Sequence, residues 1–261
     1  MRIRKGMSYG LWTLNALSLG FIAPAAMAAP TDAAPLPTTA YTKTSGDNPS
    51  DAKGSLSIRW DATLASKYLW HGIDYNDGHP AVQPEAVLAY DAYSATLWLN
   101  YDLHTHTPNE VDLYLQYARE IKNLSLTLGY AHFNYPHRKG WGPSQEVSIS
   151  LALKTAFNPI LSFHEDYASG KGTYAELGLS QRIEHPLGAL SFATNLYYHD
   201  SYYDLTGFPS LEFQGSNSYA AGSVSITPSL AYFLTWNNGD FTGGNAVPDA
   251  WLFSLNIAQK F

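Results

Sequence analysis

The C-terminal segment alternates apolar and polar residues with a period of two. Counting back in steps of two from the end of the chain, the apolar positions are Phe261, Ile257, Leu255, Phe253 and Trp251. Only Gln259 interrupts this row. In a β-strand, residues two apart point to the same face. The segment is therefore predicted to be a strand with one apolar face and one mixed face.

The same alternation recurs through most of the chain after residue 54. In residues 56–64, apolar positions alternate with serine, arginine, aspartate and threonine, which is typical of a strand with one polar face. Strands are expected near residues 56–64, 82–91, 95–101, 111–117, 124–130, 147–153, 159–168, 175–179, 189–199, 209–217, 224–234 and 249–261. About twelve strands are predicted, and an even number lets both ends of a barrel lie on the periplasmic side. Pro228 is expected to cause a bulge or a local break in pairing, because it has no N–H to donate.

Short and long connections alternate between these segments. Short connections are expected near residues 91–93, 121–123, 157–159, 184–188 and 217–221. Longer connections are expected near residues 70–81, 104–109, 135–144, 168–172, 200–208 and 237–248. Short periplasmic turns and long extracellular loops are typical of outer-membrane barrels. The sequence therefore predicts an all-β fold, a transmembrane antiparallel up-and-down β-barrel over residues 55–261, in preference to a soluble β-sandwich.

Residues 1–28 have the features of a cleavable signal peptide. Basic residues precede an apolar stretch, and Ala26 and Ala28 supply the small residues of a cleavage site. A retained membrane anchor is the alternative, but Asn15 and Pro24 interrupt the stretch, which falls short of the roughly 20 residues that a spanning helix needs. Residues 29–54 are expected to form a flexible periplasmic lead-in, or else a short plug. The predicted location is the outer membrane of a Gram-negative bacterium.

The charge balance excludes one class of partner. Removing residues 1–28 takes away three basic and no acidic residues, so 15 − 3 = 12 basic residues face 22 acidic ones and the net charge is −10. Nucleic-acid binding would need clustered Lys and Arg, so no nucleic-acid partner is expected. The chain contains no cysteine, and its stability therefore cannot depend on disulfides. No cofactor is expected either.

Acidic residues recur on the polar parity near the upper ends of alternate strands. They are Glu85, Glu110, Asp112, Glu146, Glu176 and Glu212. Because the apolar parity faces lipid, these carboxylates are expected to point into the lumen and form a partial ring that favours cations. The alternative is that they pair with inward bases and fill a narrow barrel. The candidate bases are Arg59, Lys67, Lys154 and Arg182, of which Arg59, Lys154 and Arg182 are expected toward the periplasmic end, at a distance from the acids.

Histidines gather in or beside the predicted outer loops. They are His71, His79, His104, His106, His132, His137 and His199. His104 and His106 are weak candidates for a transition-metal site, since imidazole is a common ligand of such metals. A solvent-exposed role without a metal is the simpler interpretation.

Two short segments combine serine and histidine as a hydrolase would. His199-Asp200-Ser201 is one, and Ser162-Phe163-His164 is the other, with Asp166 on the same parity as His164. Such coincidences are common in a chain rich in both residue types, and they establish no nucleophile–base geometry. No catalytic residue is therefore predicted, and a barrel hydrolase acting on lipid remains an alternative.

The segment SKYLWHGIDYNDGHPAVQPEAVLAY, residues 66–90, resembles the first hairpin of the TorF-type family of proteobacterial porins. In that family a strand ends in an aromatic residue and an Arg-Gly pair, and a Pro and a Gln open the next strand. Tyr68, Gly72, Pro80 and Gln83 match this pattern, whereas His71 stands where arginine is usual. EVDLYLQYA, SLTLGYAHFNYP, QEVSISLALK and TYAELGLSQ continue the likeness. The resemblance implies an outer-membrane β-barrel and no particular substrate.

These observations together predict a passive outer-membrane channel for small hydrophilic solutes, with a mild preference for cations. Its other expected partners are outer-membrane lipid and the barrel-assembly machinery. The machinery is expected to recognise a membrane-insertion signal in the last strand, made of Trp251, Phe253, Leu255, Ile257 and Phe261. A non-conducting structural or adhesive barrel, which would bind through its outer loops, is a further alternative.

Overall fold

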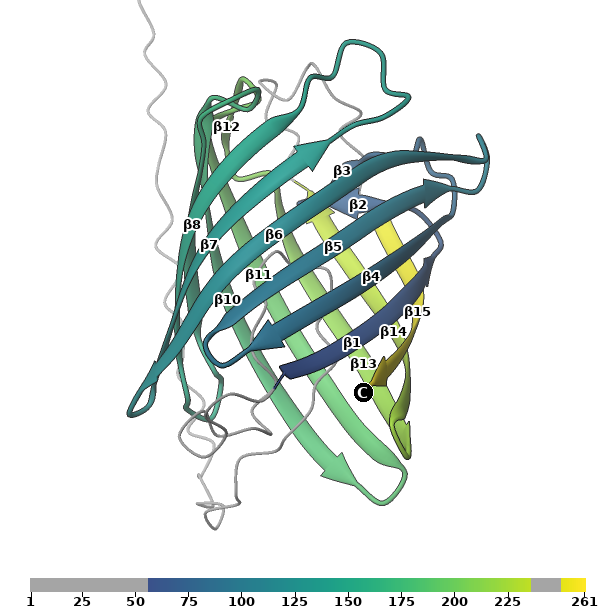
Figure 1. Cartoon of the computed structure of the whole chain (residues 1–261), viewed down its shortest axis with the longest axis vertical. Helices are drawn as coiled ribbons and strands as arrows, with labels where there is room; N and C mark the ends of the chain where they lie inside the picture. The colour runs from purple at the N-terminus through teal and green to yellow at the C-terminus, as the bar shows by residue number, and fades with distance from the viewer. Residues whose placement is uncertain (1–55, 236–249) are drawn as a thin grey trace, which may run out of the picture.

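The chain forms a closed antiparallel β-barrel in the computed structural model, which describes residues 56–235 and 250–261 (Figure 1). The predicted signal peptide, the lead-in and the expected loop at 237–248 lie outside these residues. Among the described residues, none belongs to a helix long and apolar enough to cross a membrane.

The wall of the barrel consists of twelve strands, as the alternation of residues predicts. They are β1 (Leu56–Ala65), β4 (Ala81–Tyr90), β5 (Tyr93–Asp102), β6 (Thr107–Ile121), β7 (Leu124–Asn134), β8 (Ser144–Leu153), β9 (Ile160–Asp166), β10 (Gly172–His185), β11 (Gly188–Tyr202), β13 (Ser210–Ala221), β14 (Val224–Thr235) and β15 (Ala250–Lys260). Each strand pairs with its neighbours, and β1 pairs with β15 from Arg59↔Lys260 to Ala65↔Ser254. This last pairing leaves the wall without a free edge.

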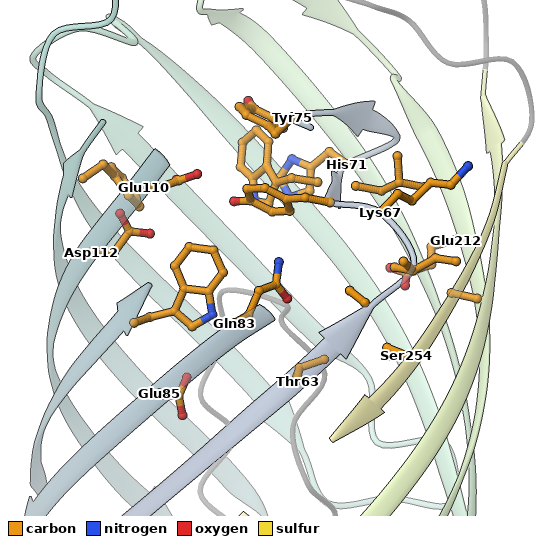
Figure 2. A pocket seen from close by; sticks show the side chains of 18 of the residues that line it. Thr63, Lys67, His71, Tyr75, Gln83, Glu85, Glu110, Asp112, Glu212 and Ser254 are labelled. Atoms are coloured by element: carbon orange, nitrogen blue, oxygen red, sulfur yellow. The ribbon is translucent and has the colours of Figure 1, made fainter. Parts of the chain in front are cut away.

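Three short strands do not belong to the twelve. Strand β12 (Leu205–Gly207) extends the β11 edge above the wall. Strands β2 (Leu69–Trp70) and β3 (Ile73–Asp74) form a separate two-stranded sheet. This small sheet lies inside the ring of wall strands, toward the end opposite the C-terminus (Figures 1 and 2). The expected outer loop at 70–81 therefore turns inward, which the sequence pattern did not indicate.

Connections alternate in length as predicted, with one exception: the connection at 154–159, expected to be short, is longer than the outer connections at 103–106 and 167–171. Four connections at one end contain two residues each, at 91–92, 122–123, 186–187 and 222–223. Asp91 and Lys122 occupy the left-handed region, with φ of 53° and 58°, as tight hairpin turns require. The C-terminus lies at this same end (Figure 1).

The outer face of the barrel is apolar. Leu97, Leu115 and Phe253 keep 54%, 45% and 60% of their surface exposed, and leucine, isoleucine, valine and phenylalanine recur around the wall in the same way. An apolar surface of this extent is unfavourable in water and suits contact with lipid. The predicted insertion residues Trp251, Phe253, Leu255, Ile257 and Phe261 all belong to this exposed set.

Pro228 interrupts one ladder, as expected from its missing N–H. Strand β13 pairs with β14 at Ser216↔Ser229 and again at Tyr219↔Ile226, without pairs between them. The register is the same on both sides of this gap, so the irregularity is a local break and not a bulge. Pro228 remains opposite Leu255 in the β14–β15 ladder.

Candidate functional site

A short hairpin crosses the lumen and divides it. The hairpin comprises residues 68–75, which include β2, β3 and the turn between them, and is called the inner hairpin below. The backbone N–H of Tyr75 donates to the carbonyl of Tyr68 at 2.8 Å and closes its base. Gly72 has φ of +79°, and a Cβ at this position would lie 2.8 Å from Cβ of Ser210 on β13. Only glycine therefore allows the turn to approach this wall so closely.

One side of the inner hairpin packs against β10 and β11. His71 Nδ1 lies 2.9 Å from His199 Nε2, and the His71 ring stacks on Tyr197 with centroids 4.0 Å apart. Trp70 meets the edge of Tyr174 at 5.5 Å. His71 and His199 are 4% and 0% exposed, so the expectation of solvent-exposed outer-loop histidines is wrong for this pair. The physical reason is that the inward turn at Gly72 brings the loop against the wall.

The opposite side is attached to β5 and β6 by a network of amides. Asn76, which follows the inner hairpin, accepts hydrogen bonds at Oδ1 from Asn109 at 2.8 Å and Asn100 at 3.2 Å. Asn100 also accepts from Gln83 at 3.0 Å. All four side chains are buried. Hydrogen bonding satisfies buried polar groups that would otherwise destabilise the fold, and here it joins the hairpin to the second wall.

The loop between β7 and β8 packs on the inner hairpin from its other face. Arg138 donates to the backbone carbonyl of Tyr75, and its guanidinium lies 5.2 Å from the centroid of the Tyr75 ring and 4.9 Å from that of Trp141. Cation–π contacts of this kind hold the loop and the hairpin together. The inner hairpin is thus fixed from two walls and from one outer loop.

Burial determines the charge of His71. Desolvation lowers the pKa of this imidazole well below its ordinary value of 6.5, and the neighbouring His199 and His164 lower it further. A buried imidazole beside other imidazoles is more stable in its neutral form. His71 therefore contacts its neighbours as a neutral ring at neutral pH.

A cavity of about 150 Å³ adjoins the inner hairpin within the barrel (Figure 2). Its lining includes His71 and Tyr75 of the hairpin and polar side chains of β1, β4, β5, β6 and β13 to β15. The carboxyl groups that line it belong to Asp61, Glu85, Glu110, Asp112 and Glu212. The cavity is thus the part of the lumen in which the acidic side chains meet.

The six predicted lumenal acids all lie inside the barrel, but in different surroundings. Glu110 and Asp112, which are 4% and 2% exposed, line the cavity. Glu212 also lines it and accepts hydrogen bonds from Tyr197 at 2.6 Å and Asn195 at 3.2 Å. Glu146 lies 2.6 Å from His164 Nδ1, outside the cavity lining. Glu176 is buried on β10 and is likewise no part of the lining.

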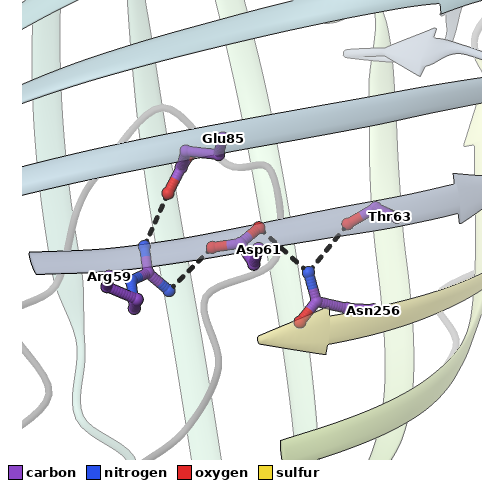
Figure 3. Close-up of polar contacts among 5 residues, drawn as sticks. All are labelled: Arg59, Asp61, Thr63, Glu85 and Asn256. Carbon is purple, nitrogen blue, oxygen red and sulfur yellow. Dashed lines mark hydrogen bonds and ion pairs between the residues drawn. The ribbon is translucent and has the colours of Figure 1, made fainter. Parts of the chain in front are cut away.

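The expectation that Arg59 lies at a distance from the acids is wrong. Its Nη2 lies 2.5 Å from Glu85 Oε1, and its Nη1 lies 3.1 Å from Asp61 Oδ2 (Figure 3). Asn256 on β15 donates to Asp61 at 3.1 Å and to Thr63 at 2.9 Å. Asp61 faces Glu85 in the β1–β4 register, and a long arginine side chain two residues away reaches both. Glu85 therefore pairs with an inward base, which was the alternative interpretation of the lumenal acids.

Among the described residues, the other predicted bases form no ion pair with the six acids. Lys154 pairs with Glu120 at 2.7 Å, and Arg182 pairs with Glu184 at 2.6 Å, near the short turns. Lys67 lines the cavity, but its ammonium points away from Glu110 and Asp112 (Figure 2). The cavity thus has more acidic than basic groups.

A family of bacterial proteins matches this chain. Its model covers residues 50–182, slightly more than half of the chain, and is described as "Bacterial protein of unknown function (Gcw_chp)". The chain belongs to the Gcw_chp family. The matched region contains the inner hairpin, Arg59, Glu110 and Asp112. No curated protein matches the chain.

Solved outer-membrane barrels share the fold of this Gcw_chp protein. The NanC porin is similar over 79% of this chain and 100% of its own, with a TM-score of 0.51 and 11% identity. The COG4313 outer membrane channel from Pseudomonas putida F1 is similar over 80% of this chain and 96% of its own, with a TM-score of 0.44 and 9% identity. The likeness to the NanC porin, at this low identity, shows the barrel fold alone.

The remaining candidate chemistry of this Gcw_chp member is dispersed. His104 stacks on His79 with centroids 3.8 Å apart, and within residues 56–235 and 250–261 no three His, Asp or Glu side chains gather as a metal site would. The hydroxyl of Ser201 donates to Asp200 at 3.2 Å, whereas His199 contacts His71 across the lumen. In the other segment, Ser162 Oγ and His164 Nε2 form no hydrogen bond with any described residue. Neither serine–histidine segment therefore shows a triad arrangement.

Sequence reasoning missed the aromatic part of the cavity. Tyr68, Trp98 and Tyr114 line it together with the acids. Trp98 and Tyr114 occupy the polar parity of β5 and β6, on which Asp112 also lies. An aromatic residue on that parity was the available signal, because such a residue has to lie inside the barrel.

Proposed function

We propose that this protein is an outer-membrane channel for the passive diffusion of small hydrophilic solutes, with a mild preference for cations. The apolar exterior supports a place in lipid, and the closed wall with a polar interior supports a path through it. The fold shared with porins is consistent with this proposal.

The observation that carries the cation preference is the composition of the cavity. Five carboxyl side chains line it, and Lys67 is the basic residue of the lining. Arg59 contacts two of these carboxylates, Asp61 and Glu85. Among the described residues, Glu110, Asp112 and Glu212 form no ion pair, although the charge of Arg138 acts on Glu110. The confined space focuses the potential of these carboxyl groups.

The inner hairpin narrows this channel. The hairpin and the adjacent Asn76 contact β5 and β6 on one side and β10, β11 and β13 on the other. Solutes therefore have to pass around the hairpin or displace it. The same observation supports a second candidate function, a barrel that is closed at rest and opens when the hairpin moves. Both candidates predict a current, but the second predicts discrete closed periods.

Planar-bilayer recordings of the purified full chain test the proposal. In a KCl gradient, the reversal potential is expected to show cation preference. The Glu110→Gln/Asp112→Asn double variant is expected to move this potential toward zero, because it removes two lumenal carboxyl groups that form no ion pair among the described residues. Asp91→Asn, an exposed carboxylate in a turn, is the matched control and is expected to leave the potential unchanged.

Other outcomes would contradict the channel. A folded barrel that carries no current under any voltage would overturn it and would favour a structural or adhesive role. Hydrolysis of lipid that is lost in His164→Ala or Ser201→Ala would favour the enzyme alternative. If the double variant conducts with an unaltered reversal potential, the protein is a channel but these carboxylates do not determine its selectivity.

A further inference from the structure

The cavity beside the inner hairpin presents hydrogen-bond acceptors without donors. Among the described residues that line it, four side chains carry a buried oxygen that no hydrogen-bond donor reaches. The atoms are Glu110 Oε2, Asp112 Oδ1, Gln116 Oε1 and Gln214 Oε1. All four are carboxylate or amide oxygens. A ligand that satisfies them has to bring donors, and preferably positive charge.

Two of these oxygens belong to deeply buried carboxylates on one strand. Glu110 and Asp112 lie two residues apart on β6, so their side chains point to the same face. Both point into the cavity (Figure 2). Tyr114 donates to Asp112 Oδ2 at 2.9 Å, which leaves Oδ1 of the same carboxylate without a donor. Buried carboxylates with a free acceptor favour a cationic partner, because burial without one is unfavourable.

Aromatic rings form the wall next to these carboxylates. Tyr68, Trp98 and Tyr114 line the cavity, and the ring centroids of Tyr68 and Trp98 are 5.7 Å apart. The faces of such rings attract cations and also pack against short hydrocarbon stems. A fully hydrated inorganic ion would use the carboxylates but gain little from the apolar ring faces. The combination of acids and rings is suited to an organic cation.

We infer that this cavity is a binding site for a small organic cation that carries a primary ammonium group. The ammonium donates to Glu110 and Asp112, and its short hydrocarbon stem lies against Tyr68 and Trp98. Three N–H donors on one ammonium match several acceptors at once. The cavity volume of about 150 Å³ has room for a ligand of a few non-hydrogen atoms. The inference rests on the proposed function, because a solute reaches this cavity through the channel, and it names the class of solute.

Isothermal titration calorimetry on the full chain in detergent micelles tests this site with propylammonium chloride. Uncharged 1-propanol is the probe of similar size, and KCl at equal concentration is the inorganic competitor. Propylammonium is expected to bind, 1-propanol to bind at least tenfold more weakly, and KCl to displace propylammonium only at large excess. Equal binding of both organic probes, or equal competition by potassium, would overturn the inference.

Variants locate the binding. Asp112→Asn is nearly isosteric and is expected to weaken propylammonium binding about tenfold, the effect of losing one charge-assisted hydrogen bond. Trp98→Leu keeps every carboxylate and is expected to weaken it severalfold. Asp91→Asn, with the same chemical change at an exposed turn, is expected to have no effect. Circular dichroism is used to check that each variant still forms the β-barrel. If both cavity variants fold and still bind propylammonium with unchanged affinity, the binding site is not this cavity.

The two proposals fail in different ways. A barrel that conducts with cation preference but does not bind propylammonium would retain the channel and overturn the site. A barrel that binds propylammonium in the manner described but never conducts would retain the site and overturn the channel.

Discussion

At the scale of single residues, Gly72 and His71 decide how the inner hairpin meets the wall. Gly72 supplies a left-handed backbone and a close approach to Ser210. His71 supplies a flat neutral ring that fits between Trp70, with centroids 3.7 Å apart, and Tyr197. Ser210 and Tyr197 belong to the wall strands β13 and β11, whereas Gly72 and His71 belong to the inner hairpin. These two contacts therefore report on docking of the hairpin and not on formation of the barrel.

Replacing Gly72 by alanine is expected to loosen the inner hairpin. A left-handed backbone costs an L-residue about 1–2 kcal/mol, and the added Cβ would lie 2.8 Å from Cβ of Ser210. Faster hydrogen exchange is therefore expected at the amides of residues 68–76, with unchanged exchange in the wall strands. Gly78→Ala is the matched control, because this glycine also has a positive φ but its Cβ would meet nothing closer than 3.8 Å.

Lowering the pH is expected to open the channel through His71. The docked hairpin holds this ring neutral with a lowered pKa, whereas an undocked ring has the ordinary value of 6.5. Docking is therefore fully favourable above pH 6.5 and weakens as the pH falls below it, because only the undocked form takes up the proton. The titratable groups around the ring are His199, His164, Tyr197 and Tyr174.

Single-channel conductance recorded between pH 7.5 and pH 5 measures this opening. The wild-type conductance is expected to rise as the pH falls, and a smaller rise is expected in His71→Phe, which keeps an aromatic ring but binds no proton. An equal response in both proteins would show that other groups control the channel.

At the scale of elements, the inner hairpin and the wall strands are held in place by different contacts. Its buried contacts, together with those of the adjacent Asn76, lie with β5, β6, β10 and β11, none of which directly precedes or follows it in the sequence. The wall strands, in contrast, pair with sequence neighbours apart from the β1–β15 closure. A change in the hairpin should therefore alter the lumen without altering the barrel.

Replacing residues 69–74 by Asn-Gly is expected to give a larger and steadier conductance. The existing bond between Tyr75 N–H and the Tyr68 carbonyl lets a two-residue turn close the gap. Replacing the exposed residues 104–106 by Asn-Gly changes an outer loop without changing the inner hairpin, and this variant serves as the control. Conductance equal to that of the wild type in the hairpin variant would show that the hairpin does not restrict the path.

At the scale of the whole molecule, the C-terminal residue contributes little side-chain packing to the barrel. Phe261 is 65% exposed, and its backbone N–H donates to the carbonyl of Ile58 at 2.9 Å. A substitution that keeps the backbone therefore keeps this bond. This separates the stability of the finished barrel from the recognition of its last strand during assembly.

Phe261→Ala is expected to reduce the amount of folded barrel in cells, with less than about 1 kcal/mol lost from the stability of the purified barrel, as for most exposed positions. The amount is measured in isolated outer membranes, and the stability by urea unfolding in detergent. Phe157→Ala, which truncates another exposed aromatic residue, 62% exposed, is the control and is expected to assemble normally. Equal amounts of both variants would contradict a role of Phe261 as an insertion signal.

The pattern of residues predicted the barrel well because its physics is local. A period of two separates the two faces of every strand, so the alternation of apolar and polar positions, read strand by strand from Phe261 back to Leu56, assigned the lipid and lumen sides. It also placed Glu110, Asp112 and Glu212 inside. The break in pairing at Pro228 could be predicted from its missing N–H alone.

The sequence by itself therefore determined the twelve wall strands, their order and the faces of their side chains, but not the short strands β2, β3 and β12. Only the tertiary structure decided that residues 68–75 turn inward, that Arg59 reaches Glu85, and that acids and aromatic rings share one cavity. The hairpin has the glycine and histidine content of an outer loop, so composition could not reveal its position. The tilt and register of a closed barrel decide which inward side chains meet, because they bring together residues that lie far apart along the chain.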